Sequence, residues 1–317
     1  MKKCVCFLLA ICFISIICNC SDKITVYVGG YKSGKAIYWK NGQEITIKNT
    51  VKNPSAESIF VLGKDVYIAV DDKDFKAKYW KNGEFIYLPV DNEKSLTKSI
   101  FVINKDVYVA GIDGFNKPVY WKNNEKVMLP VSSEYDGSTV NSLFVSENDV
   151  YVAGYDVYRA TYWKNGKAFH LTDGKYVQTA NSIFVVGNDV HIVGSDNWKG
   201  EFAVIKYWKN GKGINITDGS KSSMGNSIFV SNNDVYIAGY EDGRAKYWKN
   251  GEGIYLDEGA EATSIFVLGN DVYVAGYSKD VKYVYTTAIY WKNGIAVNLT
   301  DGTYSAFARS IFVVEEK

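Results

Sequence analysis

Short apolar stretches of four to seven residues follow one another from residue 24 onward, in a repeated order of four. The first is Ser-Ile-Phe-Val, as at 58–61, and the second is Asp-Val-Tyr-Val-Ala-Gly, as at 106–111. The third ends in Tyr-Trp-Lys-Asn-Gly, as at 38–42, and the fourth is looser, as at 213–217. β-Branched and aromatic residues fill these stretches and Gly, Asn and Asp bound them, which predicts β-strands. No stretch has a helical apolar period of useful length.

The third stretch recurs seven times, and its tryptophan marks the period. Successive tryptophans lie 41, 41, 42, 45, 40 and 43 residues apart, at Trp39, Trp80, Trp121, Trp163, Trp208, Trp248 and Trp291. A period near 42 with strand-like flanks is typical of repeat proteins, in which each unit buries its apolar faces against its neighbours.

Turn chemistry orders the strands within each unit. Asn-Gly between the third and fourth stretches predicts a tight hairpin, because both residues tolerate positive φ angles. The third unit has Asn123-Asn124 instead, and we expect Asn124 to adopt that region at some cost. Pro89 and Pro130 are assigned to the fourth strand, which we therefore place at the outer edge of its sheet. The second strand is apolar on both faces, so both faces must be covered.

The two ends of the repeat region complement each other. It begins with a second stretch at 24–30 and stops just after a first stretch at 310–313. Residues 24–317 number 294, or seven times 42. These observations predict an all-β fold, a seven-bladed β-propeller of four-stranded antiparallel blades whose C-terminal strand joins the N-terminal blade and closes the ring. An open solenoid would need polar capping repeats.

Residues 1–20 have the pattern of a secretory signal peptide, with Lys2 and Lys3 before an apolar run at 5–18. That run is short for a membrane span, which needs about 20 residues. The segment 17–20, Ile-Cys-Asn-Cys, resembles a bacterial lipobox, although residues 18 and 19 are not the usual small ones. The resemblance implies acylation of Cys20 and a lipoprotein of the cell envelope; ordinary cleavage with secretion, or an uncleaved anchor, are the alternatives.

Composition narrows the function classes. All five cysteines fall within residues 1–20, so the repeat region has no disulfide, thiolate nucleophile or cysteine metal site. Without Lys2 and Lys3 the chain has 34 basic and 35 acidic side chains, which gives no reason to expect nucleic-acid binding. His170 and His191 are the only histidines and belong to no metal motif, so we expect no metal and no cofactor. Membrane contact is expected only through a lipid on Cys20, and the protein is expected to be a monomer.

The repeat resembles the HAF-type repeats of secreted bacterial propellers, through Tyr-Trp-Lys-Asn-Gly and Val-Tyr-Val-Ala-Gly across residues 24–317. The resemblance implies an extracellular propeller. The repeat is also similar to WD repeats in length and strand order, but it lacks the Gly-His and Trp-Asp pairs of that family.

Features that recur in every unit favour structural roles. A lysine follows each repeated tryptophan, and an aspartate begins most second strands; a pair such as Asp149 and Lys164 would meet at one end of a blade. The repeated Trp and Tyr residues are assigned to packing between blades rather than to sugar stacking. For the repeated lysines and aspartates, the alternative is a charged ring that binds a ligand.

Residues that do not repeat are the candidates for binding. Trp198 lies in a long connection at 195–205, Tyr283 and Tyr285 lie in another at 278–287, and Tyr304 lies in a connection between units. The residue before each Ser-Ile-Phe-Val also varies, and if the first strand is innermost these residues encircle the channel mouth on the same face. They are Glu57, Lys98, Asn141, Asn181, Asn226, Thr263 and Arg309. Loops on a rigid scaffold carry function, so this face is the candidate binding face.

The sequence therefore favours a non-catalytic binding or scaffold protein of the bacterial cell envelope, which engages a protein or glycan through the long-loop face. The alternative is a channel-centred carbohydrate-active enzyme, a hydrolase or lyase. Paired carboxylates could serve such an enzyme, but no motif requires one. A purely structural envelope protein is a third possibility.

Overall fold

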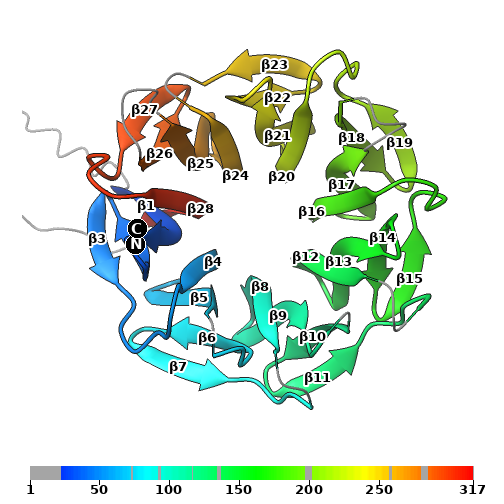
Figure 1. Cartoon of the computed structure of the whole chain (residues 1–317), viewed down its shortest axis with the longest axis horizontal. Coiled ribbons are helices and arrows are strands. Elements are labelled where there is room, and N and C mark those ends of the chain that lie inside the picture. Colours follow the sequence, from blue (N-terminus) through cyan, green and yellow to red (C-terminus); the bar gives the residue numbers. More distant parts are fainter. Residues whose placement is uncertain are drawn as a thin grey trace, which may run out of the picture.

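The computed structural model describes residues 23–72, 74–91, 94–115, 117–133, 137–196, 202–256, 259–279 and 285–316. Seven four-stranded antiparallel sheets surround a central axis, so the predicted seven-bladed β-propeller is confirmed (Figure 1). In each blade the first repeated stretch is the innermost strand and the fourth is the outermost.

The strands of each blade follow one another from the axis outward. Blade 1 contains β28 (Ala306–Glu316), β1 (Lys23–Lys32), β2 (Lys35–Lys40) and β3 (Gln43–Thr46). Blade 2 contains β4 (Ser55–Leu62), β5 (Asp65–Asp71), β6 (Lys78–Lys81) and β7 (Glu84–Tyr87). Blade 3 contains β8 (Leu96–Ile103), β9 (Asp106–Ile112), β10 (Pro118–Lys122) and β11 (Glu125–Met128). Blade 4 contains β12 (Ser138–Ser146), β13 (Asp149–Asp156), β14 (Arg159–Lys164) and β15 (Lys167–His170). Blade 5 contains β16 (Gln178–Val186), β17 (Asp189–Asp196), β18 (Val204–Lys209) and β19 (Lys212–Asn215). Blade 6 contains β20 (Ser223–Ser231), β21 (Asp234–Glu241), β22 (Arg244–Lys249) and β23 (Glu252–Tyr255). Blade 7 contains β24 (Glu261–Leu268), β25 (Asp271–Lys279), β26 (Thr286–Lys292) and β27 (Ile295–Asn298).

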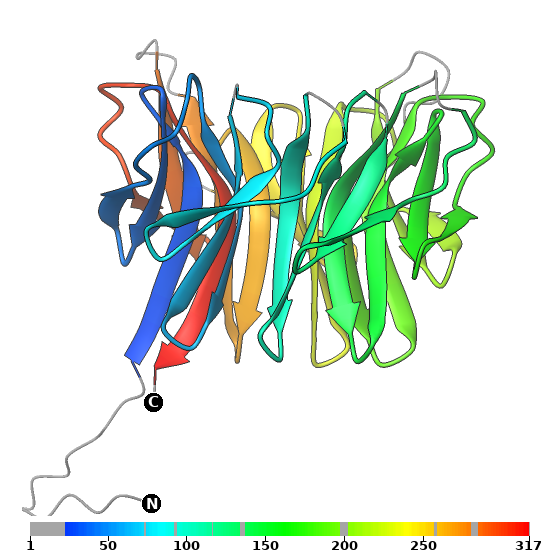
Figure 2. The same ribbon diagram turned by 90° about the horizontal axis from the view of Figure 1, so that it is seen from below.

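The ring closes through blade 1, as predicted. Strand β28 pairs with β1 along its length, from Lys23 opposite Glu316 to Lys32 opposite Ala306. The two ends of the described chain therefore lie side by side at one face of the ring (Figure 2).

The molecule has two different faces. We call the one with the Asn-Gly turns the turn face, and the opposite one, with the connections between second and third strands and between blades, the loop face. At each turn the first Asn has a positive φ angle, between 47° and 53°. In the third unit we expected Asn124 to adopt a positive φ angle, and this expectation was wrong. Asn123 has φ 53°, whereas Asn124 is not at positive φ.

The outer-edge position of the fourth strand is confirmed, but the assignment of the two prolines to it was wrong. Strands β7 and β11 end at Tyr87 and Met128, so Pro89 and Pro130 lie in the following connections. There their carbonyls accept hydrogen bonds of 2.8 Å from indole nitrogens of the next blade, Trp121 Nε1 and Trp163 Nε1. Proline, which has no N–H of its own, still contributes this acceptor.

Repeated aromatic residues pack between blades, as predicted. All seven repeated tryptophans are at most 7% exposed, and Trp163, for example, packs with Tyr108 and Ala110 of the preceding blade. Serines of the innermost strands add a ring of polar contacts between blades. In all seven, Ser Oγ accepts a hydrogen bond of 3.0–3.3 Å from a backbone N–H of the next blade, as Ser142 does from Ile183.

Candidate functional site

A β-bulge in every innermost strand presents one side chain at the mouth of the central channel. In blade 4, Val140 pairs with Gly154 and Ser142 with Ala153, which leaves Asn141 unpaired between them. A bulge of this kind re-aims the side chain of the extra residue. The bulged residues are Glu57, Lys98, Asn141, Asn181, Asn226, Thr263 and Arg309, the variable set that the sequence indicated.

A glycine opposite the bulge permits this geometry in six blades. A Cβ on Gly154 would overlap the carbonyl oxygen of Thr139, and the five equivalent glycines face the same obstruction. They are Gly30, Gly111, Gly194, Gly239 and Gly276. The final glycine of the second repeated stretch is thus required by close backbone approach. Blade 2 has Val70 at this position, and nothing in the structure explains the exception.

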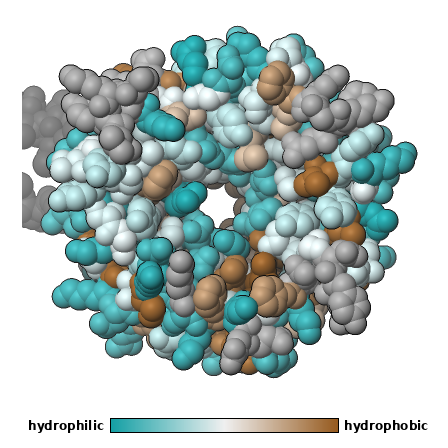
Figure 3. Space-filling view, viewed as in Figure 1, coloured by the Kyte–Doolittle hydropathy of each residue, from teal (hydrophilic) through white to brown (hydrophobic). Residues whose placement is uncertain are grey.

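All seven bulged residues line one cavity of about 330 Å³ at the loop face. Figure 3 shows the opening at the centre of this face, bordered by hydrophilic residues. Four bulged residues donate hydrogen bonds to backbone carbonyls of the next blade. They are Asn141 Nδ2 to Ala180 (3.1 Å), Asn181 Nδ2 to Gly225 (2.8 Å), Asn226 Nδ2 to Ala262 (2.9 Å) and Thr263 Oγ1 to Ala308 (2.9 Å).

In the three remaining blades, which are consecutive, the bulged residue is charged. Arg309, Glu57 and Lys98 belong to blades 1, 2 and 3. The Lys98 ammonium lies 3.5 Å from the Asp71 carboxylate. Burial raises the pKa of Asp71, and Lys98 partly opposes that rise. The channel mouth is therefore polarised, with four neutral bulged residues on one arc and three charged ones on the other.

A further carboxylate lies on the neutral arc. Glu261 accepts hydrogen bonds from Asn226 Nδ2 (2.9 Å) and from the Tyr277 hydroxyl (2.6 Å). The pKa of Tyr277 is raised, first by burial and then by this carboxylate. Both donors are neutral side chains, and their hydrogen bonds hold the Glu261 carboxylate in place.

A closed ring of seven phenylalanines lies three residues deeper along the innermost strands, or about 10 Å at strand rise. Neighbouring ring centroids are 4.6–5.1 Å apart, all around the channel. The members are Phe60, Phe101, Phe144, Phe184, Phe229, Phe266 and Phe312. The tilted contacts are a favourable aromatic arrangement. A polar mouth therefore leads to an apolar ring of aromatic side chains.

The aromatic candidates of the loop face divide into two groups. Tyr285 and Tyr304 are 46% and 57% exposed, and their ring centroids are 6.4 Å apart, so the structure brings them together. Trp198 and Tyr283 lie outside the described residues, as does Cys20.

The turn face is built from one repeated set of contacts. In six blades a lysine ammonium lies 2.7–3.3 Å from the aspartate that begins the second strand, as in Lys164–Asp149. The turn asparagine joins the same strand: Asn165 Oδ1 accepts from Val150 N–H (2.8 Å) and its Nδ2 donates to Asp149 (2.7 Å). Hydrogen bonds from Lys164 and Asn165 lower the pKa of Asp149. These contacts join neighbouring strands within each blade, which is the structural role expected for the lysine and aspartate pairs.

The two histidines take part in local contacts. His191 is buried at the repeated tyrosine position, and its Nδ1 lies 2.7 Å from the Tyr207 hydroxyl. His170 Nδ1 lies 3.0 Å from Thr161 Oγ1. Within the described ranges no group of three or more His, Cys, Asp or Glu residues could hold a metal ion. No helix of these ranges is long and apolar enough to span a bilayer.

A solved structure that is similar to this chain is the crystal structure of the computationally designed Ika8 protein, in its crystal packing No.1 in P63. It has 15% sequence identity to this chain and a TM-score of 0.52, over 92% of this chain and 91% of the designed one. At that identity the similarity establishes the fold alone. Neither a protein-family model nor a curated protein matches the chain. The class that fold and site define is a seven-bladed β-propeller with a polar channel mouth.

Proposed function

We propose that this protein is a non-catalytic binding scaffold of the bacterial cell envelope, which engages a protein or glycan through its loop face. The observation that carries the proposal is the difference between the two faces. The turn face repeats one set of lysine, aspartate and asparagine contacts. The loop face gathers the variable residues of all seven blades and the exposed pair Tyr285 and Tyr304. Variation on one face of a rigid ring is typical of ligand recognition.

The cellular setting belongs to the same proposal. Residues 1–20 would direct export, and acylation of Cys20 would anchor a monomeric propeller to the membrane surface. The described chain starts at Lys23 on the turn face, so an anchor there would leave the loop face turned away from the membrane. The resemblance to HAF-type extracellular repeats supports this setting.

A glycan array, together with capture of envelope proteins, tests the binding role. A Tyr285→Ser, Tyr304→Ser double variant should weaken the ligand signal, because truncating two exposed aromatic rings removes contact area. Ile295→Ser is the matched control, since Ile295 is 73% exposed and begins the strand that follows a turn-face turn. Equal loss in both variants, or in neither, would refute recognition through the loop face.

The enzyme alternative is a carbohydrate hydrolase or lyase at the channel mouth, and the observation that favours it is Asp71. Its raised pKa and its place beside Glu57 are features of a candidate acid–base pair. A Glu57→Gln variant that abolished turnover of a glycan, while glycan binding stayed intact, would support this alternative.

A further inference from the structure

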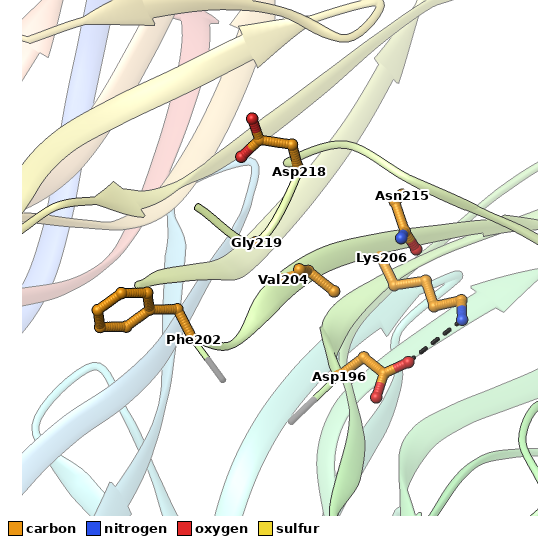
Figure 4. Close-up of a pocket in the computed structure, with 7 residues that line it drawn as sticks. All are labelled: Asp196, Phe202, Val204, Lys206, Asn215, Asp218 and Gly219. Carbon is orange, nitrogen blue, oxygen red and sulfur yellow. Dashed lines mark hydrogen bonds and ion pairs between the residues drawn. The ribbon is translucent and has the colours of Figure 1, made fainter. Parts of the chain in front are cut away.

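A second cavity of about 350 Å³ opens at the loop-face end of blade 5, away from the channel mouth. We call it the blade-5 pocket (Figure 4). Its volume is near the lower end of the range of small-molecule sites, about 300–1,000 Å³. The side chains that line it include Asp196, Phe202, Val204, Lys206, Asn215 and Asp218.

Comparison with the other blades explains how the described residues of blade 5 come to line a cavity. The β17–β18 register places Val204 opposite Asp196, and the equivalent residues are Arg159 in blade 4, Arg244 in blade 6 and Thr287 in blade 7. The Arg159 side chain lies against Gly174. The Arg244 guanidinium lies 4.2 Å from the centre of the Tyr255 ring. Val204 is too short to cover the corresponding surface, so blade 5 keeps the space that an arginine fills in its two neighbours.

The carboxylate in the pocket has also lost the partners that its equivalent has. In blade 4, Asp156 accepts hydrogen bonds from the Ser138 hydroxyl (3.1 Å) and from the backbone N–H of Ser132 (2.9 and 3.0 Å). In blade 5, Asp196 Oδ2 pairs with Lys206 Nζ at 3.2 Å, while Oδ1 has no hydrogen-bond partner in the part of the chain that the structure describes.

On the other side of β17, the residue that pairs with Asp196 also has a hydrogen-bond acceptor without a partner. Gln178 occupies the position of Ser138, and its Oε1 is a buried acceptor that also has no partner among the described residues. Asp196 and Gln178 are each only 6% exposed. A buried acceptor without a donor is unfavourable. Of these two residues only Asp196 lines the pocket, where a bound hydroxyl group would donate to its carboxylate.

The charged side chains of the pocket determine which class of ligand it can bind. A cation at Asp196 would be repelled by the ammonium of Lys206, which already lies beside that carboxylate. An anion would be repelled by Asp196 and Asp218. Hydroxyl groups avoid both penalties, because they donate to carboxylates and accept from the ammonium of Lys206 and the amide of Asn215.

The remaining walls suit the apolar face of such a ligand. Phe202 is 57% exposed and lies at the pocket with Val204 (Figure 4). An exposed aromatic ring beside several polar groups fits a compact molecule with one C–H face and a rim of hydroxyls. A pyranose has this form.

We propose that the blade-5 pocket binds one neutral sugar residue, with Asp196 and Asp218 accepting from its hydroxyls, Lys206 and Asn215 donating to its oxygens, and Phe202 packing against its ring. This inference rests on the proposed binding function and gives the class and place of one ligand.

Binding of the methyl glycosides of glucose, galactose, mannose and N-acetylglucosamine to the whole chain tests it, by saturation-transfer NMR with titration. At least one glycoside should bind, and Val204→Arg should weaken it about tenfold or more by restoring the side chain of blades 4 and 6. Val204→Thr keeps the space and should bind as the unchanged protein does. Thr287→Arg makes the same change at the equivalent place in blade 7 and should have no effect.

Asp196→Asn, with Asp156→Asn as its blade-4 counterpart, gives a second route if Val204→Arg does not fold. Only the blade-5 change should weaken binding. The inference is wrong if no glycoside binds, or if binding survives both Val204→Arg and Asp196→Asn. Sugar binding that survives them but is lost in the Tyr285, Tyr304 double variant would leave the scaffold proposal standing and refute this pocket. Capture of a protein without any sugar binding would do the same.

Discussion

Single residues that break the repeat show what the repeat requires. His191 occupies the position that holds tyrosine in the other six blades, and burial lowers its pKa, with Lys209 adding to the effect. Because the folded protein then binds this proton less readily than the unfolded chain does, the neutral imidazole favours folding at high pH. That contribution is lost as the pH falls from the unfolded pKa of about 6.5 towards the lower pKa of the folded protein.

His191→Tyr should therefore flatten the dependence of stability on pH between about pH 7 and pH 5. Tyrosine fits, because blades such as blade 4 already combine Tyr151 and Tyr162 at the two equivalent positions. Denaturant unfolding of both proteins across this interval measures the effect. Parallel curves for the two proteins would show that His191 does not titrate differently on folding.

The asparagines of the channel mouth permit a second test at this scale. Asn141→Ala removes the amide that bonds to the Ala180 carbonyl, and we expect the free energy of unfolding to fall by about 1 kcal/mol. Glu57→Ala, at the bulged position of blade 2, is the control and should change stability by less than about 0.5 kcal/mol. Equal effects of the two variants in a urea titration would mean that this hydrogen bond contributes nothing to stability.

At the scale of the element, the bulge in each innermost strand determines where a side chain points. Gly154→Ala should lower the free energy of unfolding by about 2 kcal/mol or more, because the new Cβ meets the Thr139 carbonyl oxygen and the backbone must shift. Gly137→Ala is the matched control, since its Cβ would have only one neighbour within 4 Å, at 3.9 Å. Thermal unfolding of both variants measures the difference, and similar midpoints would contradict the close approach.

The bulge also separates what the sequence could predict from what it could not. Asn-Gly turns, strand composition and the offset of the two ends were sufficient for strand order, blade number and closure. The variable residue before each Ser-Ile-Phe-Val was correctly placed at the channel mouth. Its bulged pairing was not foreseen, although the glycine that ends the second stretch is the signal that could have indicated it.

The blade-5 pocket was missed for a different reason. It depends on Val204 standing where other blades have Arg159 or Arg244, and that equivalence follows from strand register. The connections before these residues differ in length, so their places within the connections do not show that they are equivalent. The hydrogen-bond partners of Asn141, Asn181 and Asn226 likewise depend on the packing of neighbouring blades, which a single strand does not specify.

At the scale of the whole molecule, closure through blade 1 joins the chain ends by strand pairing rather than by blade packing alone. Strand β28 pairs with β1 and contributes Phe312 to the phenylalanine ring and Ser310 to the serine ring. Opening blade 1 therefore breaks a β-ladder as well as the contacts between blades.

Two circular permutants can test this role, each with Lys23 and Glu316 joined by the same short linker. One opens at the β12–β13 turn, between Ser146 and Asp149, so that β12 becomes the C-terminal strand and must still pair with a strand from the other end. The other opens at Gly137, at the boundary between blades 3 and 4, so that every blade is continuous and no ladder joins the ends.

We expect the first permutant to unfold in a single transition near that of the unchanged protein, and the second to unfold at a lower denaturant concentration. The reason is that only packing between two adjacent blades would resist opening of its ring. If the second permutant were equally stable, strand pairing between the ends would contribute nothing to closure, and side-chain contacts between blades would account for it entirely.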